Sequence, residues 1–236
     1  MSTIAENIAA IRARIDAAAR LSGRTGADIT LVAATKMNDA ARVREAVAAG
    51  IDACGENRVQ EMTEKLAVGA YTGAPLHFIG HLQTNKVRQV VGRVELIESV
   101  GSEHLLEAIE AQAAKLELVQ DILLEVNIGG EASKSGISPE ELSALAAQAV
   151  GSPHVRLRGL MAIPPVSPEP GANRPFFAAM RQLFVDIKGK MAHNQDDMDC
   201  LSMGMSGDYA DAIAEGSTLV RVGTALFGPR PPMTRQ

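Results

Sequence analysis

The chain has 236 residues, of which 46% are hydrophobic and 3% aromatic, and its formal net charge is −5. This length suits a single domain, and the acidic balance argues against a nucleic-acid or anionic-membrane surface. No segment approaches the roughly 18 apolar residues that a membrane span needs, and the N-terminus does not resemble a signal peptide, so we expect a cytoplasmic protein. Cys54 and Cys200 lie far apart in apolar runs, which predicts buried free thiols.

Short apolar runs alternate with helical patterns along the whole chain. The first element is a predicted helix with Ile4, Ile8, Ile11 and Ile15 on one face. Eight strands are then expected, at residues 29–36, 51–55, 76–80, 94–100, 119–128, 156–163, 200–203 and 219–222. A helix is expected after each of the first seven strands, beginning near residues 39, 58, 84, 102, 138, 176 and 208, and the last strand is followed by the segment 224–227.

The alternation of strands and helices predicts a parallel sheet, and eight such units favour a closed barrel. We therefore expect an α/β fold, a single (β/α)8 TIM barrel with an extra N-terminal helix. The domain should span residues 1–228, followed by a disordered tail at 229–236. An open, doubly wound sheet is the alternative, because sequence periodicity does not show closure.

Lys36 closes the most apolar of the lysine-terminated segments, at the end of the first predicted strand. An amine in that position is partly desolvated, which favours its neutral, nucleophilic form and Schiff-base chemistry with an aldehyde. The alternative is a structural lysine whose ammonium group extends from the strand end into water.

Polar residues gather at the carboxyl ends of the predicted strands. Barrels of this kind form their sites at that end. These strand-end positions are Lys36, Asn57, His81, Ser99, Asn127, Met161, residues 202–206 and residues 221–224. Such a set predicts a cavity for a small polar ligand.

Two of these segments suggest a phosphate site. Residues 202–208 (SMGMSGD) place hydroxyl groups and glycines directly before a predicted helix, which offers backbone N–H groups to an anion. Residues 222–225 follow the eighth strand in the same style, with Gly223 permitting close approach of the backbone. Barrels often bind phosphate in the loops after strands seven and eight.

Arg221 lies between two valines in an apolar strand, where an unpaired guanidinium would be costly. One interpretation is a salt bridge to a neighbouring strand, with Glu125 or Glu98 as partner. The other is a hydrogen-bond donor to a ring nitrogen or an anionic group of a ligand.

Other polar residues have simpler explanations. His77 and His81 lack a third candidate ligand nearby, so no metal site is expected. Glu61, Glu64 and Lys65 are most simply the charged, solvent-facing side of a helix.

Five segments resemble, in order along the chain, those of the pyridoxal phosphate homeostasis proteins, which are single-domain relatives of the barrel in alanine racemase. They are residues 55–61, 77–86, 158–161, 201–208 and 220–228, and the strings GENRVQE and SMGMSGD are long enough to be specific. Departures are small: Cys54 stands where an aromatic residue is usual, and no tryptophan precedes His77.

The resemblance implies that Lys36 holds pyridoxal 5′-phosphate (PLP) as an internal aldimine and that Arg221 faces the pyridine nitrogen. The other cofactor contacts that it implies are Ser202, Ser206, Gly223 and Thr224 at the phosphate, and Asn57 beside the ring. It implies no catalytic residue and no metal.

The function implied is buffering and delivery of PLP in intracellular vitamin B6 homeostasis by a monomer, with apo forms of PLP-dependent enzymes as partners. An arginine beside the pyridine nitrogen disfavours its protonation and weakens the ring as an electron sink. In the racemase relatives a second domain and a partner subunit supply a tyrosine base, and neither Tyr71 nor Tyr209 is an obvious substitute. A weakly active PLP-dependent racemase and a class I aldolase using Lys36 remain alternatives.

Overall fold

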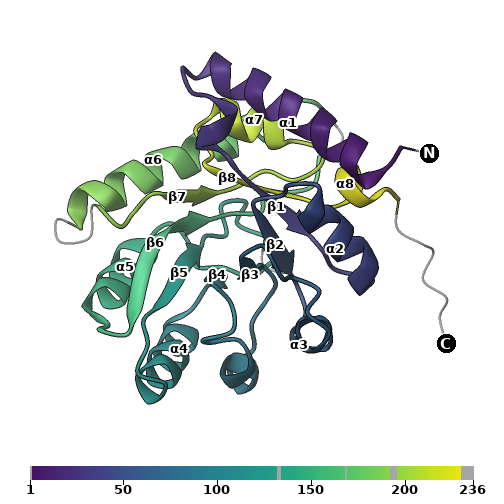
Figure 1. Ribbon diagram of the computed structural model, residues 1–236. Helices are drawn as coiled ribbons and strands as arrows, with labels where there is room; N and C mark the ends of the chain where they lie inside the picture. The colour runs from purple at the N-terminus through teal and green to yellow at the C-terminus, as the bar shows by residue number, and fades with distance from the viewer. Residues whose placement is uncertain (1, 132–133, 168, 192–195, 230–236) are drawn as a thin grey trace.

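A computed structural model describes residues 2–131, 134–167, 169–191 and 196–229. Within them, eight parallel strands close into one barrel in the order β1 to β8, and helices cover its outside (Figure 1). The prediction of a (β/α)8 barrel is confirmed, and the open-sheet alternative is wrong. The expected disordered tail lies outside the described residues from 230 onward and stays a prediction.

The strands are β1 (Thr30–Ala34), β2 (Ala53–Glu56), β3 (Leu76–Phe78), β4 (Leu96–Val100), β5 (Gln120–Glu125), β6 (Val155–Met161), β7 (Cys200–Ser202) and β8 (Leu219–Val222). The helices are α1 (Ile4–Leu21), α2 (Ala40–Ala48), α3 (Val59–Ala67), α4 (Glu103–Lys115), α5 (Leu142–Gly151), α6 (Arg174–Lys190), α7 (Tyr209–Ala214) and α8 (Thr224–Phe227). Two 3₁₀ helices complete the described part, η1 (Gly26–Asp28) and η2 (Thr84–Gln89).

Two expected helices differ from the prediction. The segment at Thr84 is a 3₁₀ helix, and Gly92, with a φ of 75°, turns the chain soon afterwards, which leaves room only for a short helix. Ser138 and Glu141 do exchange capping-box hydrogen bonds, but α5 begins three residues later than expected, at Leu142. The reason is tertiary: Ile137 is hydrogen-bonded to the end of β5, and the chain must turn before the helix can start.

Side chains alternate between the two faces of the barrel wall. Val32, Leu96, Leu123 and Leu219 pack together in the interior of the barrel. Outward-facing residues of the same strands, such as Leu31, join the larger core under the helices. This alternation decides which strand-end residues reach the barrel mouth.

Helix α1 covers the wall near β8 and β1, where α8 is only four residues long. It packs against α2, α7 and α8 (Figure 1). Asn7 Nδ2 donates to the carbonyl oxygen of Leu226 at 2.9 Å, and the Arg14 guanidinium lies 5.2 Å from the centre of the Tyr209 ring. The extra N-terminal helix therefore takes the place of a full-length last helix.

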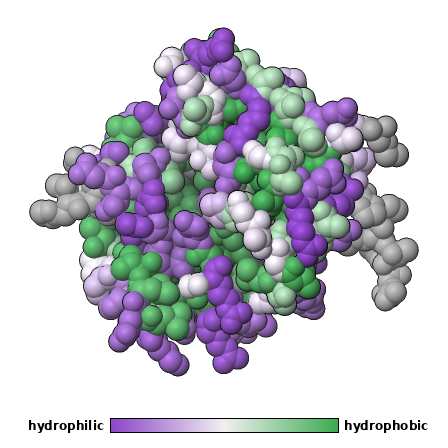
Figure 2. Space-filling view, viewed as in Figure 1, coloured by the Kyte–Doolittle hydropathy of each residue, from purple (hydrophilic) through white to green (hydrophobic). Residues whose placement is uncertain are grey.

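The face seen in Figure 1 carries interspersed hydrophilic and hydrophobic residues (Figure 2). Among the described residues, no helix combines the length and apolar character that crossing a bilayer requires.

Candidate functional site

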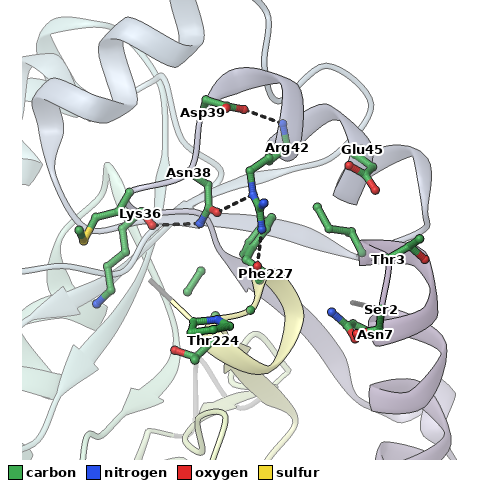
Figure 3. Close-up of a pocket in the computed structure, with 16 residues that line it drawn as sticks. Ser2, Thr3, Asn7, Lys36, Asn38, Asp39, Arg42, Glu45, Thr224 and Phe227 are labelled. Carbon is green, nitrogen blue, oxygen red and sulfur yellow. Dashed lines mark hydrogen bonds between the residues drawn. The ribbon is translucent and has the colours of Figure 1, made fainter. Parts of the chain in front are cut away.

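Lys36 follows β1 at the mouth of the barrel and is half-buried. It has the same parity as Val32 and Ala34, whose side chains face inward, so Lys36 starts from the inner face of the wall. Together with Gly223 and Thr224 it lines a cavity of about 740 Å³. Figure 3 shows Lys36 at the strand end and Thr224 on the segment after β8.

A chain of hydrogen bonds ties the Lys36 backbone to α2 and α8 (Figure 3). Asn38 Nδ2 donates to the carbonyl oxygen of Lys36 at 3.1 Å, and Arg42 Nε donates to Asn38 Oδ1 at 3.1 Å. Arg42 also donates to the carbonyl oxygen of Phe227. The lysine and the segment after β8 are thus held in one unit.

Arg221 lies inside the barrel and is only 4% exposed. Its Nη2 donates to the carbonyl oxygen of Ala162 at 3.0 Å, and its Nη1 donates to the hydroxyl of Ser202. Glu98 Oε2 lies 3.6 Å from Nη1, so of the two partners expected from the sequence Glu98 forms the ion pair. Salt bridge and ligand contact are compatible here, because a guanidinium has five N–H donors.

The polar contacts continue from Arg221 across the barrel interior. Ser202 Oγ donates to Glu98 Oε2 at 2.6 Å, and His77 Nδ1 lies 2.8 Å from Glu98 Oε1. Because β3 and β4 stand opposite β7 and β8 in the closed strand order, this network spans the inside of the wall. His77 therefore has a structural partner, and the described residues contain no cluster of three or more His, Cys, Asp or Glu that could hold a metal.

The buried charges shift one another's ionisation. Burial lowers the pKa of Arg221, while the charges of Glu98 and Glu125 oppose the shift. Burial alone would raise the pKa of Glu98, but the hydrogen bond and charge of His77, with Arg221 and Ser202, bring it below its ordinary value. Burial raises the pKa of Glu125, and Arg221 only partly opposes this.

The two glycine-containing loops meet at the side chain of Ser206. Its Oγ accepts hydrogen bonds from the backbone N–H groups of Gly223, at 3.2 Å, and Ala225, at 3.3 Å. Two amides therefore converge on one oxygen atom, an arrangement that also suits an oxygen of an anion. Asp208 Oδ1 accepts a hydrogen bond from the Met205 N–H at 2.7 Å, which stabilises the loop that carries Ser206.

Close packing explains two glycines at the site. Gly204 has a φ of 94°, and a Cβ there would lie 2.6 Å from the Cβ of Ala212. Gly80 packs so closely on the backbone of Asn57 that a Cβ would lie 2.1 Å from its carbonyl oxygen. At Gly223 a Cβ would meet the Cβ and the carbonyl oxygen of Ala34 at 3.4 Å, so packing alone does not require glycine there.

Asn57 lies on the other side of the mouth, beside a second cavity of about 300 Å³ that Glu125 and His81 also line. Its Oδ1 is shielded from solvent and has no hydrogen-bond partner among the described residues. A buried acceptor without a partner is costly, so Asn57 Oδ1 is a candidate acceptor for a donor group of a ligand.

The structure brings Lys36, Gly223 and Thr224 into one cavity, with Ser206 bonded to the same loop. Ser202 differs from the expected phosphate ligand: its fully buried hydroxyl is engaged by Glu98 and Arg221 inside the barrel.

The charged-face explanation is wrong for Lys65, which is only 7% exposed and forms an ion pair with the buried Glu56. Of the two cysteines, both free, Cys54 is buried and Cys200 is partly exposed.

The comparisons with known proteins agree with this barrel fold. Residues 6–231 match the family described as alanine racemase, N-terminal domain. The chain is 45% identical over 230 residues to the pyridoxal phosphate homeostasis protein of Pseudomonas aeruginosa, covering 98% of this chain and 97% of that protein. It is 40% identical to the protein of the same name from Aquifex aeolicus, covering 95% of this chain and 97% of that protein.

A solved structure of PipY from Synechococcus elongatus with PLP bound matches with a TM-score of 0.83 and 33% identity, covering 96% of this chain and 100% of that chain. Sequence identity of 45% and 40% over almost the full length of both relatives, together with the shared fold, establishes family membership. The chain belongs to the family of pyridoxal phosphate homeostasis proteins.

Proposed function

We propose that this protein binds PLP as a Schiff base on Lys36 and acts in intracellular vitamin B6 homeostasis by buffering and delivering the cofactor. Family membership and the PLP-bound structure of PipY support the cofactor and the role. The single observation that carries the residue assignment is that Lys36, at the end of β1, lines the same cavity as Gly223 and Thr224.

The residues present fit the chemical groups of PLP. Lys36 offers a primary amine to the aldehyde, and the amides of Gly223 and Ala225 offer two donors to the phosphate, together with Ser206. Bound PLP would supply an electrophilic aldehyde on an electron-withdrawing ring. Attack of the amine nitrogen on the aldehyde carbon forms the C=N bond and releases one water molecule, so capture is reversible.

The site favours storage over catalysis. Arg221 stays charged at neutral pH, and a charged guanidinium facing the pyridine nitrogen disfavours protonation of that nitrogen. Neither tyrosine lies in the mouth: the Tyr71 hydroxyl donates to Glu56 on the outer side of the wall, and Tyr209 packs under Arg14. The barrel thus holds the aldehyde without a tyrosine base beside it.

The test is a visible spectrum of the purified protein with PLP, followed by borohydride reduction and peptide mapping. We expect an imine absorbance that Lys36→Ala abolishes and a pyridoxyl group on Lys36. Lys115→Ala, which removes an exposed lysine at the end of α4, is the matched control and should leave the spectrum unchanged. A colourless wild-type protein at saturating PLP would overturn the proposal, and a reduced sugar adduct would support an aldolase.

The second candidate is a weakly active PLP-dependent amino-acid racemase, which the alanine racemase family of the barrel favours. It predicts Lys36-dependent exchange of the α-proton of amino acids with solvent deuterium. The buffering role predicts no such exchange above the rate with free PLP.

The proposal extends to location and partners. We expect a cytoplasmic monomer that passes PLP to apo forms of PLP-dependent enzymes. The large exposed hydrophobic residues are scattered over separate elements, which supports a monomer: Leu21, Met37, Val68, Leu116, Val119, Val166 and Val185. Sedimentation gives the oligomeric state, and reactivation of an apo enzyme by the loaded protein tests delivery.

A further inference from the structure

Helix α3 carries two oppositely charged residues one turn apart, Glu61 and Lys65. Lys65 Nζ lies 3.6 Å from Glu61 Oε2, and both residues also contact the chain at the end of β1. Glu64, on the same helix, is exposed. The pair is therefore directed at the barrel wall and is not part of a solvent-facing surface.

Each member of the pair holds one of the two peptide groups that flank the α-carbon of Lys36. Lys65 Nζ donates at 2.8 Å to the carbonyl oxygen of Thr35, which belongs to the peptide before Lys36. Glu61 Oε2 accepts at 2.7 Å from the N–H of Met37, which belongs to the peptide after it. One helix thus fixes the backbone on both sides of the lysine.

A buried carboxylate anchors this arrangement. Glu56 is fully buried, and its Oε1 accepts from Lys65 Nζ at 2.5 Å, from Thr35 Oγ1 at 2.7 Å and from the Tyr71 hydroxyl at 3.0 Å. Thr35 and Glu56 lie on the outer side of the wall, under α3. All three donors meet at Oε1, whereas Oε2 is buried and has no hydrogen-bond partner among the described residues, so Glu56 is held through one oxygen only.

The backbone that the pair holds is unusual. Met37 has a φ of 61°, in the left-handed region that residues other than glycine rarely occupy. The hydrogen bond from its N–H to a carboxylate offsets part of that strain. The chain therefore turns directly after Lys36. The alternation of β1 has by then placed Thr35 on the outer side of the wall and Lys36 on the inner side.

We propose that Glu61 and Lys65 are positioning residues, which hold the two peptides beside Lys36 and so direct its amine into the barrel mouth. The proposal rests on the proposed function, since it assigns a purpose to the direction of Lys36. It predicts that PLP capture depends on a helix whose side chains do not touch the cofactor.

The test compares Glu61→Ala with Glu61→Gln in the full-length protein. In Glu61→Ala we expect the Met37 amide to exchange with solvent about tenfold faster or more, the effect of losing one hydrogen bond to a carboxylate. PLP capture should slow several-fold. Glu61→Gln keeps an acceptor oxygen and should restore both rates to near the wild-type values, a rescue that a loss of general stability would not give.

The matched control is Glu64→Ala, which removes an exposed carboxylate from the same helix and should change neither rate. Lys65→Met leaves Glu56 buried without its cation and is expected to damage folding, so Glu61 carries the test. Unchanged Met37 exchange in Glu61→Ala, or faster exchange with unchanged PLP capture, would overturn the inference. Failure of the wild-type protein to capture PLP would instead overturn the proposed function, and amide exchange in the PLP-free protein would still report on the contacts.

Discussion

Glu98 and Arg221 face each other across the inside of the barrel, 3.6 Å apart, from strands on opposite sides of the wall. Both side chains are almost completely buried, and the Ser202 hydroxyl bonds to both. The pair therefore lies at the base of the mouth and keeps a permanently charged guanidinium under the site.

Replacing Glu98 with glutamine should destabilise the protein. The amide can still accept from Ser202, but Arg221 loses its closest compensating charge, and breaking a buried ion pair costs about 3 kcal/mol. The free energy of unfolding from urea denaturation at neutral pH measures the loss. Glu95→Gln, at an exposed position next to the same strand, should change it by less than about 0.5 kcal/mol, and equal effects of the two changes would contradict the prediction.

Replacing Glu125 with glutamine should change the free energy of unfolding in the opposite direction to the Glu98 replacement. Burial raises the pKa of Glu125, so its stabilising contribution is present in acid and is lost as the pH rises through that raised value. Glu125→Gln is therefore expected to increase the free energy of unfolding at neutral pH and to make little difference in acid. The pKa of Glu98 is lowered, so the stability that it contributes is lost only as the pH falls below the ordinary carboxyl value of 4.5. Parallel pH profiles for the two variants would count against this assignment.

Met37 offers a test of backbone strain beside the lysine. A β-branched side chain is poorly tolerated at its φ of 61°, so Met37→Val should cost about 1–2 kcal/mol, whereas Met37→Gly should be close to neutral. Glu117, exposed and with a φ of 53°, is the matched position far from the site. Glu117→Val should lower thermal stability similarly but leave PLP capture unchanged, while Met37→Val should affect both.

Ser206→Ala should weaken binding of the phosphate end alone. The change removes one of the three donors proposed for the phosphate, the Ser206 hydroxyl, and leaves the amides of Gly223 and Ala225 in place, and we expect the affinity for PLP to fall about tenfold. The affinity for pyridoxal, which has no phosphate, should hardly change. Equal losses for both compounds in a titration followed by absorbance would show that Ser206 acts elsewhere in the site.

Much of the fold follows from local pattern. The strand at Leu219–Val222 has the bounds expected from the sequence, because a buried apolar run and the following glycine mark it, and the segment expected after it, Thr224–Phe227, is helical. The isoleucine stripe of α1 is buried as its spacing predicts. The count of alternating units favours a closed barrel, but closure itself is seen only in the structure.

What the sequence does not disclose depends on register and tertiary contact. Lys65 resembles a surface residue in a helical pattern, and only the packing of α3 on β2 brings it to Glu56. Ser202 belongs to a loop-like string, but its pairing with Met161 and Leu219 turns its hydroxyl inward. The alternation of β4 indicates that Glu98 faces the barrel interior. Choosing Glu98 as the partner of Arg221 also requires knowing that β4 stands opposite β8.

The hydrogen bond between Asn7 and the backbone of Leu226 connects the first helix to the segment after β8. Leu226 directly follows Ala225, whose amide is one of the two that suit a phosphate, so helix α1 supports this segment from outside the barrel. Loss of this contact would remove a support from the outer side of the segment that carries Gly223 and Thr224, without any change to the residues that line the mouth.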